Sequence, residues 1–226
     1  SPYTFLSADG KCTLVGGLYN AHRSPNWKDK IFFYSHGNSS WIGDIISGNI
    51  IRKLSNFGSV FIYDYRGYGP NKGYIITEKS VINDALGAWY FVTNKKNIND
   101  IIVVGNSLGC AITCGFLALL KNNNFELPKY LLLNAPFTSI KDMVSYRFPL
   151  LSWLAIYDFN NIQNSKFFYN DMQICIFHSK DDIIIPYYQG ENLSDHIGCK
   201  LIYTIGSHGD QHLSDEALNY INLICN

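Results

Sequence analysis

The sequence has no excess of charge of either sign. Its 226 residues include 18 lysines and arginines against 18 aspartates and glutamates, so the formal net charge is zero at pH 7, and only 16% of the residues are charged. Proteins that bind nucleic acids usually present a broad basic surface. We therefore expect no nucleic-acid partner, and a small neutral substrate suits this composition better.

Long hydrophobic runs are also missing. The longest apolar run of helical character, Cys110 to Leu120, reaches about half of the roughly 20 residues that cross a bilayer. The opening residues, Ser1 to Ser7, contain neither the basic segment nor the apolar stretch that begins a signal peptide. We expect no transmembrane segment, and any contact with a membrane is expected to be peripheral.

The cysteines form no recognisable pairs. None of them is arranged as CxxC, and no histidine stands at metal-ligand spacing from them. The six are Cys12, Cys110, Cys114, Cys175, Cys199 and Cys225. This pattern favours reduced, buried thiols over a disulfide framework, and it predicts a cytoplasmic chain without a metal site.

Short apolar strands alternate with segments of helical length along most of the chain. Strands are expected at 31–35, 60–63, 101–104, 130–133, 174–177 and 200–204, and helices around 41–56, 80–96, 108–122, 188–197 and 213–224. Continuous apolar strands indicate a sheet covered on both faces, and the alternation predicts a mostly parallel sheet with right-handed crossovers. We expect residues 1–226 to form a single α/β domain.

Two segments depart from this alternation. Residues 3–19 are typical of a β-hairpin, so an antiparallel edge is expected before the parallel strands. Residues 137–170 are long for a connector and rich in aromatic side chains, which predicts a short structured insertion at a cap position. Its aromatics, such as Phe148 and Trp153, either border an apolar ligand or pack on the sheet. An insertion this short predicts a shallow, open cleft.

Residues Gly105 to Gly109 fit the pattern G-x-S-x-G. The pattern alone is weak, because about one in ten chains of this composition contains it by chance. Here it directly follows an apolar strand and directly precedes a helical run, which is the strand–turn–helix setting of a nucleophile elbow. Ser107 is therefore the candidate nucleophile. The alternative is a glycine-rich turn with an incidental serine.

A serine hydroxyl is a weak nucleophile at neutral pH, so it needs a base and a group that orients the base. Asp181 and Asp182 stand in the loop after the strand at 174–177, and His208 stands in the loop after the strand at 200–204. Side-chain chemistry does not separate the two aspartates. His212 competes with His208 for the role of base.

Stabilisation of an oxyanion needs two N–H donors that point at the same place. The first candidate is the amide of Leu108, directly after the candidate nucleophile. The second is the amide of Asn38, in the loop after the strand at 31–35. A glycine turn before a helix cap is the other interpretation of this loop.

Five segments occur in a fixed order along the chain. They are Tyr34-Ser-His-Gly-Asn38, Tyr63-Asp-Tyr-Arg-Gly-Tyr-Gly69, Gly105-Asn-Ser-Leu-Gly109, His178-Ser-Lys-Asp-Asp182 and Gly206-Ser-His208. Together they resemble the α/β-hydrolase superfamily, and they look most like the branch of serine hydrolases that contains the α/β-hydrolase-domain protein depalmitoylases. The resemblance covers nearly the whole chain. It implies the α/β-hydrolase fold, Asp182 rather than Asp181 as the acid, and His208 as the base.

The expected function is hydrolysis of an ester or thioester through an acyl-Ser107 intermediate, without a cofactor. The partner would be a small-molecule or acylated-protein substrate, as for a small carboxylesterase or an acyl-protein thioesterase. A peptidase or amidase with the same triad, and a non-catalytic ligand-binding protein of the same fold, are the alternatives. Asp64 and Arg66 are expected to form an ion pair that braces a turn outside the catalytic set.

Overall fold

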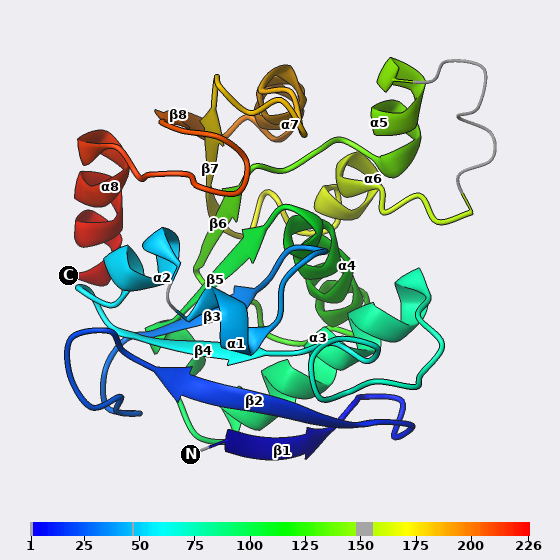
Figure 1. Ribbon diagram of the computed structural model, residues 1–226, viewed down its shortest axis with the longest axis vertical. Coiled ribbons are helices and arrows are strands. Elements are labelled where there is room, and N and C mark those ends of the chain that lie inside the picture. Colours follow the sequence, from blue (N-terminus) through cyan, green and yellow to red (C-terminus); the bar gives the residue numbers. More distant parts are fainter. Residues whose placement is uncertain (1, 47, 148–155) are drawn as a thin grey trace.

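A mixed eight-stranded sheet forms the centre of the protein (Figure 1). The computed structural model describes residues 2–46, 48–147 and 156–226. The strands are β1 (Pro2–Leu6), β2 (Thr13–Tyr19), β3 (Ile31–Ser35), β4 (Ser59–Tyr63), β5 (Ile101–Asn106), β6 (Tyr130–Asn134), β7 (Gln173–Ser179) and β8 (Lys200–Thr204). Their order across the sheet is β1-β2-β4-β3-β5-β6-β7-β8. The predicted antiparallel edge is confirmed, because β2 pairs antiparallel with β1 and β4 while the remaining neighbours are parallel.

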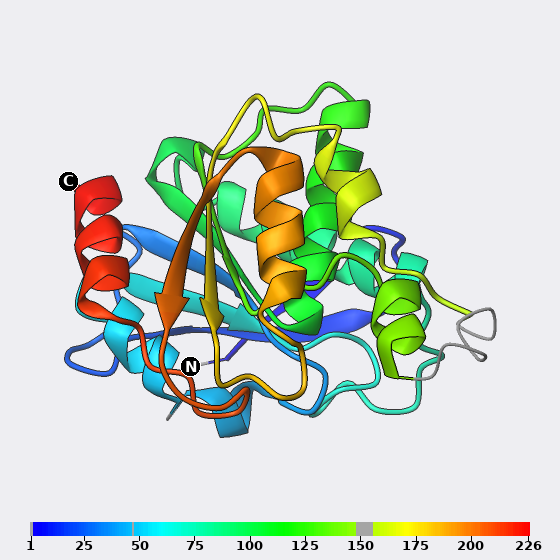
Figure 2. The ribbon, with the colours of Figure 1, turned by 90° about the horizontal axis from the view of Figure 1, so that it is seen from above.

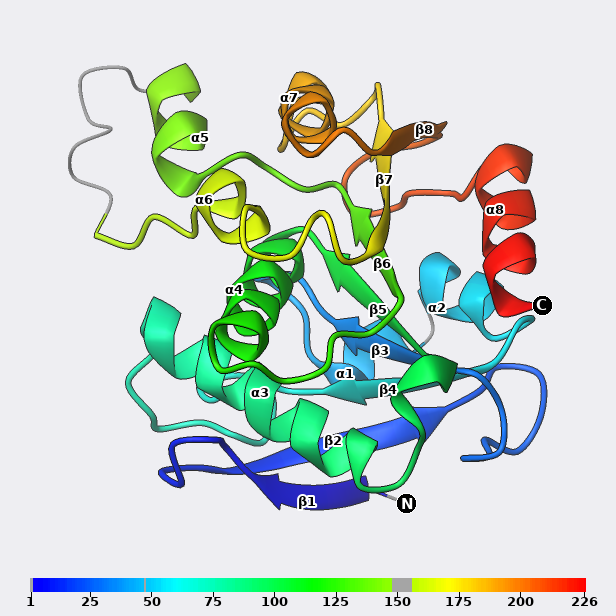
Figure 3. The same cartoon turned by 180° about the vertical axis from the view of Figure 1, so that it is seen from behind.

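Helices cover both faces of this sheet (Figure 2). They are α1 (Ile42–Ile45), α2 (Asn49–Leu54), α3 (Glu78–Thr93), α4 (Leu108–Asn122), α5 (Ile140–Arg147), α6 (Asn161–Ser165), α7 (Tyr188–Ile197) and α8 (Asp215–Cys225), with a short 3₁₀ helix at Ile98–Asp100. α1, α2 and α8 lie on one face, and α3, α4, α6 and α7 lie on the other (Figure 3).

The central strands are apolar at every position because both of their faces are buried. In β3, Ile31 and Phe33 belong to the core on the α3 and α4 side, whereas Phe32 and Tyr34 belong to the core on the α2 and α8 side. All four side chains are almost completely buried. The strand therefore anchors both helical layers, as the continuous apolar runs predicted.

The strand register brings the carboxyl ends of the parallel strands to one edge. Ser35 pairs with Gly105, and Ser179 pairs with Thr204. The loops that leave β3, β5, β7 and β8 consequently start close together. In an open α/β sheet this edge is where ligands bind.

The segment expected as one helix at 41–56 forms two short helices, α1 and α2. Gly48, directly before α2, takes an extended backbone with ψ 149° and is the N-cap of that helix. Between β6 and β7 the insertion contains α5 and α6. Within residues 2–46, 48–147 and 156–226, no helix has the length and apolar character needed to cross a bilayer.

Candidate active site

Ser107 occupies a sharp turn between β5 and α4. Its backbone has φ 54° and ψ −121°, a conformation that a residue with a side chain rarely adopts. The turn is held by hydrogen bonds from the Ser107 amide to the Asn134 carbonyl (2.9 Å) and from the Cys110 amide to the Ser107 carbonyl (2.9 Å). The side chain of Ser107 is thereby presented above the carboxyl edge of the sheet.

The two glycines of this turn permit close backbone packing. A Cβ atom on Gly105 would lie 2.7 Å from the Cα atom of Cys110, and a Cβ atom on Gly109 would collide with the carbonyl oxygens of Ser35 and His36. The end of β3 therefore rests directly on the first turn of α4. This contact brings the loop after β3 beside the turn at Ser107.

Asn38 lies in that loop and borders the same cleft as Ser107. A Cβ atom on Gly37 would be 3.3 Å from the Cβ atom of Ser107, so the loop passes directly over the turn. The side chain of Asn38 accepts a hydrogen bond from the Tyr68 hydroxyl at 2.6 Å, which fixes its position. Leu108, the other candidate donor, is the first residue of α4.

His208 reaches Ser107 from the loop after β8. Its Nε2 atom lies 3.0 Å from the Ser107 Oγ atom, and its side chain is 20% exposed. Gly206, with φ 97°, turns the chain just before it. A two-sided backbone bridge between Ile205 and His212 closes the loop and fixes His208 within it.

Asp182 lies on the far side of the imidazole from Ser107. Its Oδ2 atom accepts a hydrogen bond from His208 Nδ1 at 2.7 Å, and its Oδ1 atom accepts the amides of Ile184 and Ile185, both at 2.9 Å. Burial alone would raise the pKa of Asp182, but these bonds outweigh it and hold the pKa below its ordinary value. The carboxylate is thus kept ionised against the histidine.

Two further side chains support Asp182. Gln211 donates from Nε2 to Asp182 Oδ2 at 3.1 Å. His178 is fully buried in β7, 3.7 Å from the same oxygen, and its Nε2 donates to the Ile185 carbonyl at 2.9 Å. Burial lowers the pKa of His178, which keeps it neutral. His178 therefore holds the acid loop and does not reach the cleft serine.

The competing candidates lie elsewhere. Asp181 is exposed, and its amide donates to the Ser179 hydroxyl. The His212 side chain contacts Asn49 and lies 3.4 Å from Asp210. The structure therefore joins Ser107, His208 and Asp182 by hydrogen bonds and places Asn38 at the same cleft. Asp181 and His212 take no part in these hydrogen bonds.

The expected ion pair between Asp64 and Arg66 does not form, and this prediction was wrong. Arg66 binds Asp84 of α3 at 2.7 Å and Asp9 at 2.9 Å. Asp64 instead accepts the Ile42 amide at 2.8 Å, on the α1 side of the sheet. Both residues follow the end of β4 at Tyr63, and their partners hold them apart, Asp64 against α1 and Arg66 against α3.

The cleft above Ser107 has a volume of about 540 Å³, a size typical of small-molecule sites. Its lining combines the loops after β3, β5, β7 and β8 with α1 and α2. The apolar residues are Tyr34, Ile45, Ile50, Ile51 and Ile184, and polar ones include Asn38, Ser39, Asp44, Asn49, Asp210 and Gln211. Among the described residues, none from 137–170 borders this cleft. Phe148 and Trp153, expected near it, lie outside the described residues.

Gln211 and Tyr68 were missed by the sequence analysis. Gln211 follows His208 by three residues and Tyr68 lies in the Tyr63–Gly69 segment, but neither spacing has a recognised meaning. Their roles depend on loops that meet only in the folded chain. The hydrogen bonds of the folded chain identify them, and no sequence pattern does.

No family model matches the chain. Curated relatives do match it. The uncharacterized protein R595 of Acanthamoeba polyphaga mimivirus is 34% identical over 208 residues, covering 83% of this chain and 70% of that protein. Lysophosphatidylserine lipase ABHD12 of Xenopus tropicalis is 28% identical over 72% of this chain and 45% of the lipase. Alpha/beta hydrolase domain-containing protein 17B of Homo sapiens is 35% identical over 38% of this chain and 30% of its own length.

Among solved structures, the esterase RhEst1 from Rhodococcus sp. ECU1013 superposes with a TM-score of 0.69 at 13% identity, over 100% of this chain and 98% of the esterase. This likeness shows the shared fold. The chain belongs to the α/β-hydrolase superfamily, as its five sequence segments indicated. It spans less than half the length of ABHD12 and of protein 17B.

Proposed function

We propose that this chain is a serine hydrolase that cleaves carboxylic esters or thioesters through an acyl-Ser107 intermediate. The observation that carries the proposal is the continuous hydrogen-bonded series from Ser107 Oγ to His208 Nε2 (3.0 Å) and from His208 Nδ1 to Asp182 Oδ2 (2.7 Å). Nucleophile, base and orienting acid are thereby within hydrogen-bond reach of one another, as nucleophilic catalysis requires.

In the first step His208 Nε2 takes the proton of Ser107 as the hydroxyl oxygen attacks the acyl carbon. The same imidazole then gives this proton to the leaving oxygen or sulfur. A water molecule repeats the sequence to release the acid and restore the serine. Asp182 holds the hydrogen on Nδ1, so that Nε2 has a free electron pair, and it stabilises the imidazolium that forms.

The negative charge that develops on the acyl oxygen needs nearby donors. In this proposal the Leu108 and Asn38 amides supply them, one from the first residue of α4 and one from the loop held by Tyr68. The N-terminus of α4 contributes a partial positive charge at the same place. No step requires a cofactor.

The substrate class follows from the cleft and the relatives. ABHD12 is named as a lipase and RhEst1 as an esterase, and both names describe ester cleavage. The resemblance to the depalmitoylases adds thioesters, because their cleavage uses the same acyl-serine chemistry. A cleft of about 540 Å³ with apolar side chains from β3, α1 and α2 suits a short or medium acyl group.

The test is labelling by a fluorophosphonate probe, followed by turnover of p-nitrophenyl esters. The wild-type chain should be labelled, and Ser107→Ala should lose both labelling and about three or more orders of magnitude of turnover. Ser39→Ala is the matched control, because Ser39 borders the same cleft without contacting His208 in the described part of the chain. Labelling that survives in Ser107→Ala, or a wild type that binds the ester but never cleaves it, would overturn the proposal.

A further inference from the structure

A second hollow opens directly beside the catalytic cleft. Its volume is about 510 Å³, and it is lined by His22, Gly48, Asn49, Arg52, Lys53, Asn56, Gly209 and Asp210. Four of these residues, Gly48, Asn49, Gly209 and Asp210, also line the catalytic cleft. The two hollows therefore adjoin along these four residues. We call the second one the basic hollow.

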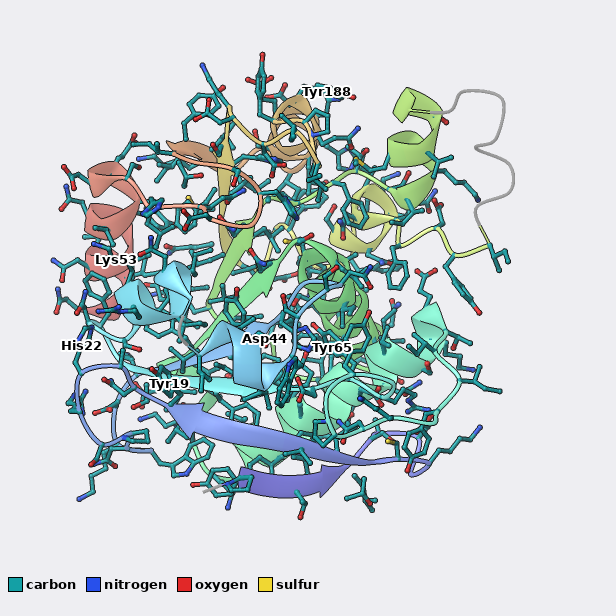
Figure 4. All side chains as sticks on the ribbon, viewed as in Figure 1. Tyr19, His22, Asp44, Lys53, Tyr65 and Tyr188 are labelled. Carbon is teal, nitrogen blue, oxygen red and sulfur yellow. The ribbon has the colours of Figure 1, made fainter. Side chains whose placement is uncertain are left out.

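Two cationic side chains line the basic hollow. Arg52 and Lys53 come from the last turn of α2, and His22 comes from the loop after β2. Figure 4 shows Lys53 and His22 on the same side of the molecule, beside α2. Asp210 is the one carboxylate in the described lining, and it lies 3.4 Å from His212 Nε2. The lining thus carries two permanent positive charges against one negative charge.

Some cations in the described part of the chain are held in ion pairs, and others, such as Lys28, Lys72 and Lys79, are not. The ion pairs include Arg23 with Asp29, Lys30 with Asp100, Arg66 with Asp84, Lys121 with Asp171 and Lys200 with Glu216. Within the described residues, the guanidinium of Arg52 and the ammonium of Lys53 form neither an ion pair nor a hydrogen bond. His22 Nε2 instead contacts the backbone carbonyl of Arg52 at 3.0 Å, which fixes the imidazole against α2.

The basic hollow lies next to the candidate base, His208. His208 passes its proton to the leaving atom, so the alcohol part of an ester must lie next to this imidazole. Gly209 and Asp210 directly follow His208 and form the boundary shared by both hollows. Consecutive Cα atoms are about 3.8 Å apart, so the basic hollow begins within one residue of the base.

We propose that the basic hollow binds a phosphate group on the alcohol part of the ester substrate. The inference rests on the proposed function, because it assigns a leaving group to the same reaction. A phosphate carries about −1.5 to −2 charges and three acceptor oxygens, enough to engage Arg52 and Lys53 together despite Asp210. The acyl C–O bond breaks, the alcohol oxygen receives the proton from His208, water supplies the second oxygen of the acid, and the phosphate ester stays intact.

The experiment compares three esters with the same octanoyl chain: 1-octanoylglycerol, its 3-phosphate and its 3-phosphocholine. At low ionic strength the wild type should cleave the phosphate ester with a kcat/KM about tenfold above that of the neutral ester. The ratio should fall as salt rises, because salt screens exposed charges. Preference for the 3-phosphate alone indicates a free phosphomonoester, and equal preference for the 3-phosphocholine indicates a phospholipid headgroup.

Variants change this ratio in opposite directions. Arg52→Gln and Lys53→Gln should each bring the phosphate-to-neutral ratio several-fold closer to one, and Asp210→Asn should raise it, because a repelling carboxylate is removed. Lys79→Gln is the control: Lys79 is an exposed cation on α3, on the opposite face of the sheet, and its substitution should leave the ratio unchanged.

The outcomes separate this inference from the proposed function. The phosphate-binding inference is overturned if the wild type cleaves both esters equally. It is also overturned if neither Arg52→Gln nor Lys53→Gln changes the ratio. The proposed hydrolase activity survives either result. If no ester is cleaved, the proposed function fails, and the hollow is then tested by calorimetric binding of glycerol 3-phosphate. That binding should weaken several-fold in Arg52→Gln and Lys53→Gln, and its absence from the wild type also overturns the inference.

Discussion

His36 Nε2 lies 3.5 Å from Asp64 Oδ1, and both side chains are fully buried beneath the loop that carries Asn38. The carbonyl of His36 also accepts a hydrogen bond from the Tyr65 hydroxyl at 2.9 Å. Burial lowers the pKa of His36 to about 4 and raises the pKa of Asp64 to about 6. The pair therefore links the stability of the fold to pH in two opposing ways.

The stability of Asp64→Asn should fall more steeply with acid than that of the wild type. Between pH 6.5 and 4, unfolded His36 binds a proton that folded His36 does not, so His36 removes stability as pH falls. Folded Asp64 binds a proton between about pH 6 and 3.8 that the unfolded state does not, which adds stability as pH falls. Without Asp64, the free energy of unfolding should drop by roughly 3 kcal/mol across this window.

Urea denaturation of Asp64→Asn and of His36→Gln from pH 4 to 7 measures how the free energy of unfolding of each variant changes with pH. His36→Gln retains Asp64 alone, so its stability relative to wild type should rise as pH falls through 6. Parallel pH profiles for the wild type, Asp64→Asn and His36→Gln would mean that neither group titrates differently in the folded state.

Loss of the carboxylate at position 182 should impair catalysis, whereas loss of the carboxylate at position 181 should not. Asp182→Asn keeps the shape of the side chain but removes the charge that fixes the His208 tautomer, so kcat on p-nitrophenyl esters should fall by about three to four orders of magnitude. Asp181→Asn should change kcat less than twofold, because Asp181 is exposed and makes no hydrogen bond to His208 within the described residues. Equal losses in the two variants would show that the acid has been assigned to the wrong residue.

Gly109→Ala should destabilise the fold although alanine is the better helix former. The added Cβ collides with the carbonyl oxygens of Ser35 and His36, which cannot move without breaking the contact between β3 and α4. We expect a loss of about 1–3 kcal/mol, which exceeds the helix-propensity gain of about 1 kcal/mol. Thermal unfolding measures it. Gly17→Ala is the control, because nothing lies within 4 Å of its added Cβ, and its melting temperature should be no lower than that of the wild type. Equal melting temperatures for the two variants would contradict the packing argument.

The sequence was sufficient for the strands and for the loops that carry the site. Apolar runs placed β3, β5, β7 and β8 within a residue or two, because both faces of a central strand are buried. Parallel order then places Ser107, Asp182 and His208 on one edge. The choice between Asp181 and Asp182 came from family resemblance, since the side chains are chemically identical and only the folded loop separates them.

Contacts between distant residues could not be predicted in this way. Arg66 pairs with Asp84 because α3 lies on one face of the sheet, while Asp64 faces α1 on the other. The basic hollow joins α2 to a loop more than 150 residues further along the chain. Such contacts depend on the side of the sheet to which each side chain points, which reverses with a one-residue shift in register.

Ester cleavage should increase with acyl length and then level off near eight carbons. Each methylene covered by apolar side chains such as Ile45, Ile51 and Ile184 adds up to about 0.8 kcal/mol, and carbons beyond the cleft add nothing. Values of kcat/KM for C2 to C16 p-nitrophenyl esters, beside matched anilides, measure this. A steady rise to C16 would indicate an enclosed lipid tunnel, and anilide rates equal to ester rates would favour a peptidase or amidase.

The most direct test of the account is to find where the acyl group is carried. The wild type is mixed with p-nitrophenyl octanoate, quenched in acid during the initial burst, and digested for mass spectrometry. The account predicts one octanoyl group on the peptide that contains Ser107 in the wild type and in His212→Ala, and none in Ser107→Ala or His208→Ala. Octanoyl on another residue, or continued turnover by Ser107→Ala at the wild-type rate, would contradict it.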